Sequence, residues 1–230
     1  MEIRHSNYRS VRNKNTERYG FAEYIKKVYM YVGGGLFLSG IAAYLTSQSL
    51  DMMIKFTTKQ GWVILLVPCF LLLWLYINIG RMSNTTARIF YMLFTITNGI
   101  SLAPIFHIYT SESITSCFFV TSAIFLCMAL YGHFTKRDLS TLGSLCTMGL
   151  FGVIIASFLN FFIMSSTIMF LSTIISVFVF VGLIAYDSQK LNLLYNIGDN
   201  QKTAIIGALA LYLDFINLFL DLLRLFGKRK

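Results

Sequence analysis

The chain has 230 residues, of which 56% are hydrophobic and 13% are charged, and its formal net charge is +9. Because soluble domains contain about 25% charged residues, this composition indicates a membrane protein and argues against a soluble globular domain. The basic charge is not assigned to nucleic acid, since no nucleic-acid-binding motif is present. Basic residues beside a membrane are instead attracted to anionic lipid headgroups.

Six segments without Asp, Glu, Lys or Arg are long enough to cross a bilayer. They cover residues 28–50, 60–80, 89–111, 113–135, 139–163 and 164–186. Each exceeds the roughly 18 apolar residues that suggest a spanning helix. A seventh segment of similar length, residues 203–226, is the one that carries acidic residues in its interior. We therefore expect an all-α integral membrane protein with seven transmembrane helices.

The distribution of basic residues predicts the organisation and orientation of the chain. We expect a basic cytoplasmic N-terminal tail at residues 1–27, a transmembrane domain at residues 28–226 and a basic C-terminal tail at residues 227–230. If all seven helices cross, 13 of the 19 Lys and Arg residues lie on the side of the N-terminus, which favours a cytoplasmic N-terminus. The basic C-terminal tail then lies on the opposite side, unless the last segment is a re-entrant hairpin. We favour seven crossings.

Other polar and special residues within the segments are interpreted as packing features. The four cysteines all lie in apolar segments and form no CxxC pair, so we expect them to be small packing residues. None of the three histidines is assigned to a metal. Pro104 is expected to kink its helix, because it has no backbone N–H to complete the hydrogen-bond ladder.

The seventh segment contains two aspartates in an otherwise apolar helix. At 3.6 residues per turn, one stripe holds Asp214, Asn217, Asp221 and Arg224. An ionised Asp at the bilayer centre costs roughly 2.5 to 3.5 kcal/mol, so this stripe must face the protein interior or a water-filled path. Asp221 and Arg224 are spaced for a local ion pair. Asp214 needs a partner from another segment.

Two residues that close other segments are candidate partners for Asp214. Asp187 closes the sixth segment in VGLIAYDSQK, and Arg81 closes the second in YINIGRMSN. Two carboxylates held close together cannot both ionise easily, so Asp187 and Asp214 would share one proton. An approaching arginine would favour their ionisation. The three residues would then act as a pH-biased switch.

At these residues the sequence resembles a known family. The matching segments are ALALYLDFINLFLDLLRLFG (residues 208–227), LIAYDSQKL (183–191) and FTITNGISLAPI (94–105). They are similar to segments of bacterial members of the Bax inhibitor-1, or transmembrane Bax inhibitor motif, family. The resemblance extends over essentially all seven segments. It implies six helices packed around a central C-terminal seventh helix, and a pH-sensitive calcium leak with an aspartate dyad as sensor and an arginine as latch.

Carried over by position, the resemblance implies that Asp187 and Asp214 form the dyad and that Arg81 is the latch. Asp221 stands where an uncharged residue is expected, so the acidic cluster would gain a third member, and Asn217 and Asp221 are candidates for lining the pore or contacting the ion. Calcium takes about six to eight oxygen ligands, so binding at Asp187 and Asp214 would be weak and hydrated. Weak binding suits permeation. Calcium is expected as the transported ion, and no cofactor is expected.

Two other functions are weighed against the channel. The family also implies an interaction protein that regulates membrane-protein quality control or cell-death and stress partners. An intramembrane aspartyl protease would also use paired aspartates. In presenilin-type intramembrane proteases, Gly-x-Gly precedes the second aspartate, whereas Tyr212 and Leu213 precede Asp214 here. Those proteases also carry a Pro-Ala-Leu motif, and no proline follows Pro104 in this sequence. We therefore expect no enzyme.

The expected partners and location follow from the same features. We expect the protein to interact with calcium ions, with the lipid bilayer through anionic headgroups at the N-terminal tail, and with other membrane proteins. No nucleic acid is expected. The bacterial form of the motifs predicts the cytoplasmic (inner) membrane of a bacterium. A simpler role for Asp187 and Asp214, in which hydrogen bonds between them only hold helices together, is the alternative.

Overall fold

A computed structural model describes residues 2–58, 61–197 and 200–230, with described side chains from Gly20 onward except those of Trp62 and Asn200. Most of the predicted basic tail, residues 1–27, therefore has side chains outside the described part. The helices of the described ranges are α1 (Glu2–Ser47), α2 (Leu50–Thr57), α3 (Gly61–Asn78), α4 (Asn84–Leu102), α5 (Ile105–Ile108), α6 (Ser111–Phe134), α7 (Ser140–Ile163), α8 (Ser166–Ile197) and α9 (Asn200–Phe226). The predicted all-α class is confirmed.

Six helical stretches in the described ranges are long and apolar enough to cross a membrane. They are Gly20–Ser47, Asn84–Ile108, Ser111–Phe134, Ser140–Ile163, Ser166–Ile197 and Gln201–Phe226. The second predicted segment corresponds to α3, whose apolar part, Val63–Asn78, is shorter than these. At 1.5 Å per residue that part reaches about 24 Å, less than the roughly 30 Å of a hydrocarbon core. Seven crossings therefore remain a prediction.

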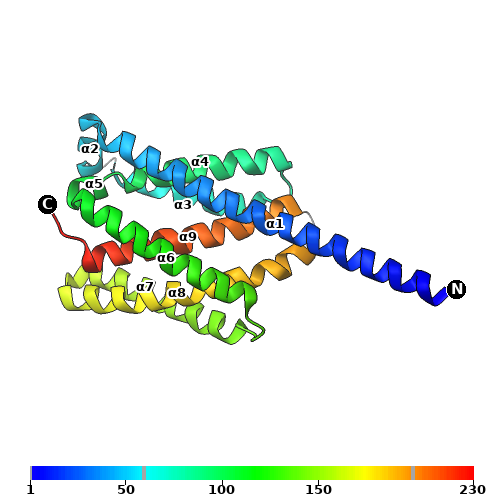
Figure 1. Cartoon of the computed structure of the whole chain (residues 1–230). Helices are drawn as coiled ribbons and strands as arrows, with labels where there is room; N and C mark the ends of the chain where they lie inside the picture. The colour runs from blue at the N-terminus through cyan, green and yellow to red at the C-terminus, as the bar shows by residue number, and fades with distance from the viewer. Residues whose placement is uncertain (1, 59–60, 198–199) are drawn as a thin grey trace.

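The long helices run back and forth along one bundle axis, so the two ends of the chain lie at opposite ends of the bundle (Figure 1). The C-terminal tail is fixed beside the connection between α5 and α6. There the N–H of Thr110 donates to the carbonyl of Lys228 at 3.0 Å, and the N–H of Lys230 donates to the carbonyl of Ile108 at 3.0 Å. We call the two ends of the bundle the N-terminal end and the C-terminal end.

Helix α9 is the most deeply buried of the six candidate spans. In its most apolar stretch 72% of the residues are buried, compared with 44% in α8 and 6% in α7. It packs against α8, α1, α6 and α4. Small residues allow this close packing, since Ala204 and Ala208 are both fully buried. Whether six helices surround α9 as the resemblance implies is still a prediction.

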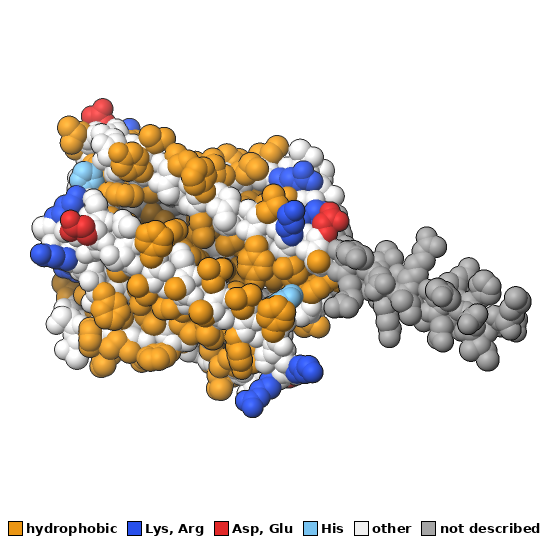
Figure 2. Space-filling view, in the orientation of Figure 1, with side chains coloured by type: hydrophobic (Ala, Val, Ile, Leu, Met, Phe, Trp, Pro, Cys, Tyr) orange, Lys and Arg blue, Asp and Glu red, His pale blue; other side chains and the backbone are white. Residues whose placement is uncertain are grey.

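The outer surface is apolar around the middle of the bundle. Figure 2 shows hydrophobic side chains over the broad middle of one face, with Lys, Arg, Asp and Glu gathered towards the two ends. Large aromatic side chains are freely exposed on α7, among them Phe151, Phe158 and Phe162. An apolar surface of this extent would be unfavourable in water and suits contact with lipid chains.

Pro104 separates two helices instead of kinking one. Helix α4 ends at Leu102, Pro104 is the N-cap of α5, and α5 extends only from Ile105 to Ile108. Proline cannot donate the hydrogen bond that would continue α4, but its fixed φ suits the start of a helix. The predicted kink is therefore observed as a helix boundary at the C-terminal end.

Candidate functional site

Asp187 of α8 and Asp214 of α9 are neighbours across the interface between these two helices. The two carboxyl groups lie close enough to interact through their charges and through a side-chain hydrogen bond. Asp214 is buried, with 5% of its surface exposed, whereas Asp187 is half-buried. The Oδ2 atom of Asp214 is buried and accepts no hydrogen bond from an N–H or hydroxyl group of the described residues, so a proton shared with Asp187 is the one way left to satisfy it. An unsatisfied buried polar atom costs about 1 to 3 kcal/mol, so this carboxyl needs a functional or structural reason.

Residues from other helices complete the electrostatic surroundings of the two aspartates. Tyr76 of α3 lies near both carboxyl groups, and Cys146 of α7 lies near Asp214. Lys190, three residues after Asp187 on α8, places a positive charge near its carboxyl group. Its Nζ lies 5.7 Å from the centroid of the Tyr186 ring, one residue before Asp187. Helices α3, α7, α8 and α9 therefore all contribute groups close to the site.

Small residues bring neighbouring helices close to α8 just before Asp187. A Cβ atom added to Gly132 of α6 would lie 2.0 Å from the carbonyl oxygen of Ala185. One added to Gly143 of α7 would lie 2.4 Å from the ring of Tyr186. Both distances are too short for real atoms. At Gly132 the obstacle is backbone, so only glycine fits there, whereas a larger residue at position 143 would require the ring of Tyr186 to move. These two contacts fix the part of α8 that carries Asp187.

Arg81, the predicted latch, is not in contact with the aspartates. It lies exposed in the turn between α3 and α4, and within the described ranges no ion pair joins it to Asp187 or Asp214. Tyr76 lies five residues before it and is near both carboxyl groups. The end of α3 thus approaches the site, while the guanidinium group of Arg81 does not reach it here. The latch role remains a prediction.

Asp221 lies further along α9 and has its own partners. It is buried, accepts a hydrogen bond from the hydroxyl of Ser176 in α8, and its Oδ1 lies 3.4 Å from Nη1 of Arg224. The predicted ion pair between Asp221 and Arg224 is therefore confirmed. Asn217 is half-buried between Asp214 and Asp221.

The expected three-member acidic cluster is not formed. Asp221 is seven residues, or about 10 Å of helix, from Asp214, and its contacts with Ser176 and Arg224 hold it towards the C-terminal end. No group of three or more His, Cys, Asp or Glu side chains in the described residues could hold a metal ion. Asp221 instead lines a separate cavity of about 260 Å³ between α7, α8 and α9.

A polar chain beside Asp214 escaped the sequence analysis. Asn98 of α4 donates its amide N–H to the hydroxyl of Tyr212 at 2.8 Å, and Ser39 of α1 donates its hydroxyl to the carbonyl of Thr95 at 2.7 Å. Tyr212 and Ser39 are 2.6 Å apart. A hydroxyl has one proton, so Tyr212 must donate to Ser39. The chain joins α4, α9 and α1 two residues from Asp214, and its polar residues could have been noticed within otherwise apolar segments.

These features define a helical membrane protein with two neighbouring carboxyl groups, one buried and one half-buried, between two of its helices. The chain belongs to the Bax inhibitor-1 family: residues 22–230 match the family described as "Inhibitor of apoptosis-promoting Bax1". The resemblance inferred from the three sequence segments is thereby confirmed.

Similar proteins occur in several bacteria. An uncharacterized protein of Rickettsia prowazekii (strain Madrid E) is 42% identical over 217 residues, which cover 92% of each chain. The inner membrane protein YbhL of Escherichia coli (strain K12) is 40% identical over 224 residues, which cover 93% of this chain and 94% of YbhL. An uncharacterized membrane protein of Streptococcus pyogenes serotype M6 is 33% identical over 217 residues, which cover 91% of this chain and 94% of that protein.

Proposed function

We propose that this protein is a pH-sensitive calcium leak channel, gated by the Asp187–Asp214 dyad with Arg81 as latch. The observation that carries the proposal is the contact between the two carboxyl groups across α8 and α9. One member is almost fully buried, and its Oδ2 atom accepts no hydrogen bond from an N–H or hydroxyl group of the described residues. Ionisable residues inside membrane spans mark ion pathways and proton relays, which supports a role in permeation.

The dyad would respond to pH because its two carboxyl groups cannot both be ionised without a large energetic cost. Two unit charges about 4 Å apart interact with about 4 kcal/mol at an effective dielectric constant near 20. An interhelical hydrogen bond in a membrane averages only about 0.6 kcal/mol. After loss of the shared proton, the repulsion between the two carboxylates would therefore exceed the energy of several interhelical hydrogen bonds. This repulsion would favour a movement of α8 relative to α9.

In the proposed cycle, the protonated dyad releases Arg81 and stabilises a closed pore, and deprotonation permits opening. An exposed Arg81 that contacts neither aspartate is the arrangement expected for the closed form. Engagement of Arg81 would supply positive charge to the deprotonated pair. The proximity of Tyr76 to both aspartates supports this step, because it places the end of α3 near the site.

Calcium would pass the site without being held tightly. Asp187 and Asp214 supply fewer oxygens than the about six to eight that calcium takes, so water would complete its shell. Asn217 and Asp221 continue the polar face of α9 towards the C-terminal end, and Asp221 lines a cavity. Weak, successive polar contacts are compatible with an ion that must also leave.

The test is calcium entry into dye-loaded liposomes that contain the purified protein, measured across roughly pH 6 to 8. We expect flux above that of empty liposomes, and a pH profile that is flattened by either Asp187→Asn or Asp214→Asn. The matched control is Asp51→Asn, which changes an exposed aspartate in α2. Arg81→Gln is expected to change the pH response without abolishing flux. Absence of protein-dependent flux at every pH would overturn the proposal.

The proposed location is the inner membrane of a bacterium, with the N-terminus in the cytoplasm. The relative YbhL is named an inner membrane protein, and the predicted bias of basic residues supports the orientation. If liposomes show no flux, the family description, which refers to inhibition of a protein that promotes apoptosis, would direct attention to a role in binding other membrane proteins.

A further inference from the structure

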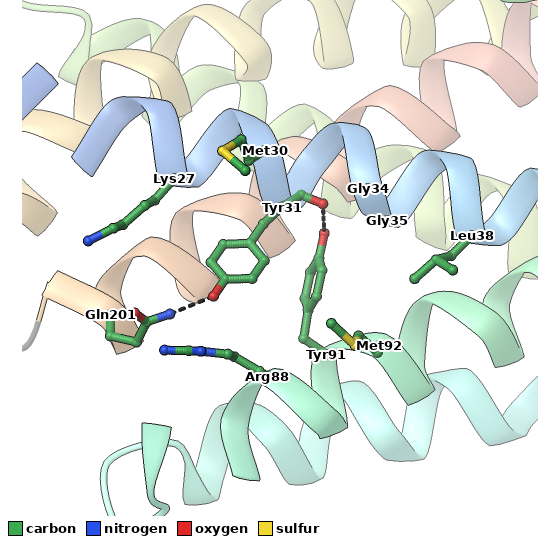
Figure 3. Close-up of a pocket in the computed structure, with 10 residues that line it drawn as sticks. All are labelled: Lys27, Met30, Tyr31, Gly34, Gly35, Leu38, Arg88, Tyr91, Met92 and Gln201. Carbon is green, nitrogen blue, oxygen red and sulfur yellow. Dashed lines mark hydrogen bonds between the residues drawn. The ribbon is translucent and has the colours of Figure 1, made fainter. Parts of the chain in front are cut away.

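A cavity of about 370 Å³ opens between α1 and α4 near the N-terminal end of the bundle. Neither aspartate of the dyad lines it. Figure 3 shows Lys27 of α1 and Arg88 of α4 reaching towards the same end of this cavity, where Gln201 of α9 also lies. We call this cavity the Lys27–Arg88 groove.

The polar end of the Lys27–Arg88 groove is rich in hydrogen-bond donors and positive charge. Arg88 is exposed and forms no ion pair with any described residue. Lys27 pairs with Glu23 at 3.1 Å, but both side chains are largely exposed, and such pairs contribute little. Among the described residues that line the groove there is no Asp or Glu. A phosphate or carboxylate is the complementary ligand for two basic groups in this arrangement.

Tyr31 and Tyr91 also line the groove, and their hydroxyls are hydrogen-bonded to Gln201 and to the carbonyl of Tyr31 (Figure 3). Apart from these hydroxyls, the remainder of the groove is apolar and follows α1 into the membrane. Met30, Gly34 and Leu38 are spaced four residues apart and all line it, opposite Met92 of α4. A Cβ added to Gly34 would meet no atom within 4 Å, so the groove is open at this position. From Lys27 to Leu38 the helix rises about 16 Å, which is half of a hydrocarbon core of roughly 30 Å. This is the depth of one lipid leaflet.

The basic end also lies at the correct level in the membrane. Lys27 is near the start of the candidate span Gly20–Ser47, and Arg88 is in the first turns of the span Asn84–Ile108. Both spans begin at the N-terminal end of the bundle. Basic side chains at this level meet lipid headgroups, while the groove below them meets acyl chains. A small soluble phosphate would occupy only the basic end and leave the apolar part empty.

We propose that the Lys27–Arg88 groove binds an anionic phospholipid from the leaflet at the N-terminal end. Its phosphate lies between the side chains of Lys27 and Arg88, and one acyl chain follows α1 past Gly34 to Leu38. This site goes beyond the proposed channel and does not depend on it. Failure of calcium flux would leave the lipid site unaffected, because lipid binding is measured without any ion gradient.

The test is native mass spectrometry of the purified protein with added phosphatidylglycerol or phosphatidylcholine. We expect phosphatidylglycerol to be retained, and Lys27→Gln or Arg88→Gln to weaken its binding by about fivefold each. Lys55→Gln, which removes an exposed basic residue from α2 at the other end of the bundle, is expected to have no effect.

A second pair of variants tests the acyl-chain part of the groove. Gly34→Leu is expected to weaken phosphatidylglycerol binding, because its side chain would fill the open part of the groove. Gly33→Leu is the matched control, since Gly33 also has no atom within 4 Å of an added Cβ but does not line the cavity. If both variants lose binding equally, or if neither loses any, the proposed position of the acyl chain is wrong.

Competition experiments separate a lipid from a soluble anion. Inorganic phosphate and glycerol phosphate are each added to the complex with phosphatidylglycerol, and neither is expected to displace it. Displacement by either would show a soluble phosphate site and contradict the proposal. Equal retention of phosphatidylcholine and phosphatidylglycerol, unaffected by Arg88→Gln, would show an apolar groove without charge recognition and would also contradict it.

Discussion

The hydroxyl of Tyr212 in α9 donates to the hydroxyl of Ser39 in α1, across 2.6 Å and 173 positions of sequence. The same Tyr212 oxygen accepts from Asn98 of α4. One phenol thus connects the most buried helix to two others, two residues before Asp214. These hydrogen bonds hold the stretch of α9 that also carries Asp214. They would therefore help to fix the position of the Asp214 side chain between the helices.

Tyr212→Phe is expected to destabilise the folded protein by about 1 to 2 kcal/mol. It removes one donor and one acceptor and leaves the buried hydroxyl of Ser39 with one partner fewer, while single interhelical bonds in membranes range up to about 1.7 kcal/mol. The measurement is thermal unfolding in detergent. Tyr44→Phe is the control, because the Tyr44 side chain is exposed. Equal unfolding temperatures for Tyr212→Phe and the unchanged protein would show that the polar chain contributes nothing to stability.

The sequence predicted the helices well because membrane spans have a strong, local signal. Runs without charge identified five of the six long candidate spans, and the acidic stripe marked the sixth, α9, as the unusual one. Asp187 and Asp214 could be paired because an aspartate within an apolar helix needs a partner. Their contact required no knowledge of loop geometry, since α8 and α9 are consecutive.

The parts that sequence could not predict depend on contacts between distant segments. The glycine at position 132 looked like any small packing residue, and only the position of Ala185 shows why it cannot be larger. The Tyr212 chain joins three helices whose order around α9 is not encoded in hydropathy. Asp221 was expected to join the dyad because helix periodicity places it on the same face of α9 as Asp214. Periodicity does not predict which residues of other helices contact that face, and Asp221 is held away from the dyad by Ser176 and Arg224.

Gly132→Ala is expected to destabilise the protein or prevent its folding. The added Cβ would lie 2.0 Å from the backbone oxygen of Ala185 and would push α6 away from α8. Gly152→Ala is the matched control: it also replaces a helical glycine, but its Cβ would meet no atom within 4 Å. In a helix interior this exchange is favourable by roughly 0.5 to 1 kcal/mol.

Expression level and unfolding temperature distinguish the two glycine variants. Gly152→Ala should be as stable as the unchanged protein or slightly more so. Gly132→Ala should unfold at a lower temperature, and flux in any folded fraction should be altered because Ala185 lies two residues from Asp187. A Gly132→Ala protein with unchanged stability would mean that the two helices can separate at little cost.

The two termini are expected to lie on opposite sides of the membrane, because they lie at opposite ends of the bundle (Figure 1). In a variant without native cysteines, Lys230→Cys and Lys55→Cys should react with a membrane-impermeant thiol reagent from the same side. Lys136→Cys, in the connection between α6 and α7, should react from the other side. Labelling of positions 230 and 136 from one side would instead support a re-entrant last segment.

Asp138 is expected to stabilise the start of α7 in a pH-dependent way. Its Oδ1 accepts hydrogen bonds from the N–H of Ser140 at 2.9 Å and from its hydroxyl at 2.6 Å. These bonds lower the pKa of Asp138 below its ordinary value. A lowered pKa in the folded state means that the contribution is complete above the unfolded-state pKa, about 3.9, and is lost as pH falls through the folded-state value.

Asp138→Ala should therefore lower the unfolding temperature near neutral pH, and the difference from the unchanged protein should shrink as the pH falls below about 4. Thermal unfolding in detergent at a series of acidic pH values measures this difference. The effect should be small, because the side chain is exposed to solvent. A difference that stays constant down to the lowest pH would show that ionisation of Asp138 makes no contribution.

Asp221 is expected to affect the size of the calcium flux and not its dependence on pH. It lies about two helix turns from the dyad and is held by Ser176 and Arg224, so its charge is set locally. Asp221→Asn keeps the shape of the side chain and removes one negative charge from the cavity that it lines. A calcium ion passing this position would lose a favourable interaction, and the flux in liposomes should fall severalfold with an unchanged midpoint.

Comparison of Asp221→Asn with Asp214→Asn tests whether pH sensing and ion contact belong to different residues of α9. If Asp214 senses pH and Asp221 contacts the ion, the first substitution changes the shape of the pH profile and the second changes only its height. Arg224→Gln should then raise the flux, since it removes the positive charge that lies 3.4 Å from Asp221. A shift of the pH midpoint by Asp221→Asn would instead show that the two carboxyl groups titrate together, in spite of the distance between them and their different hydrogen-bond partners.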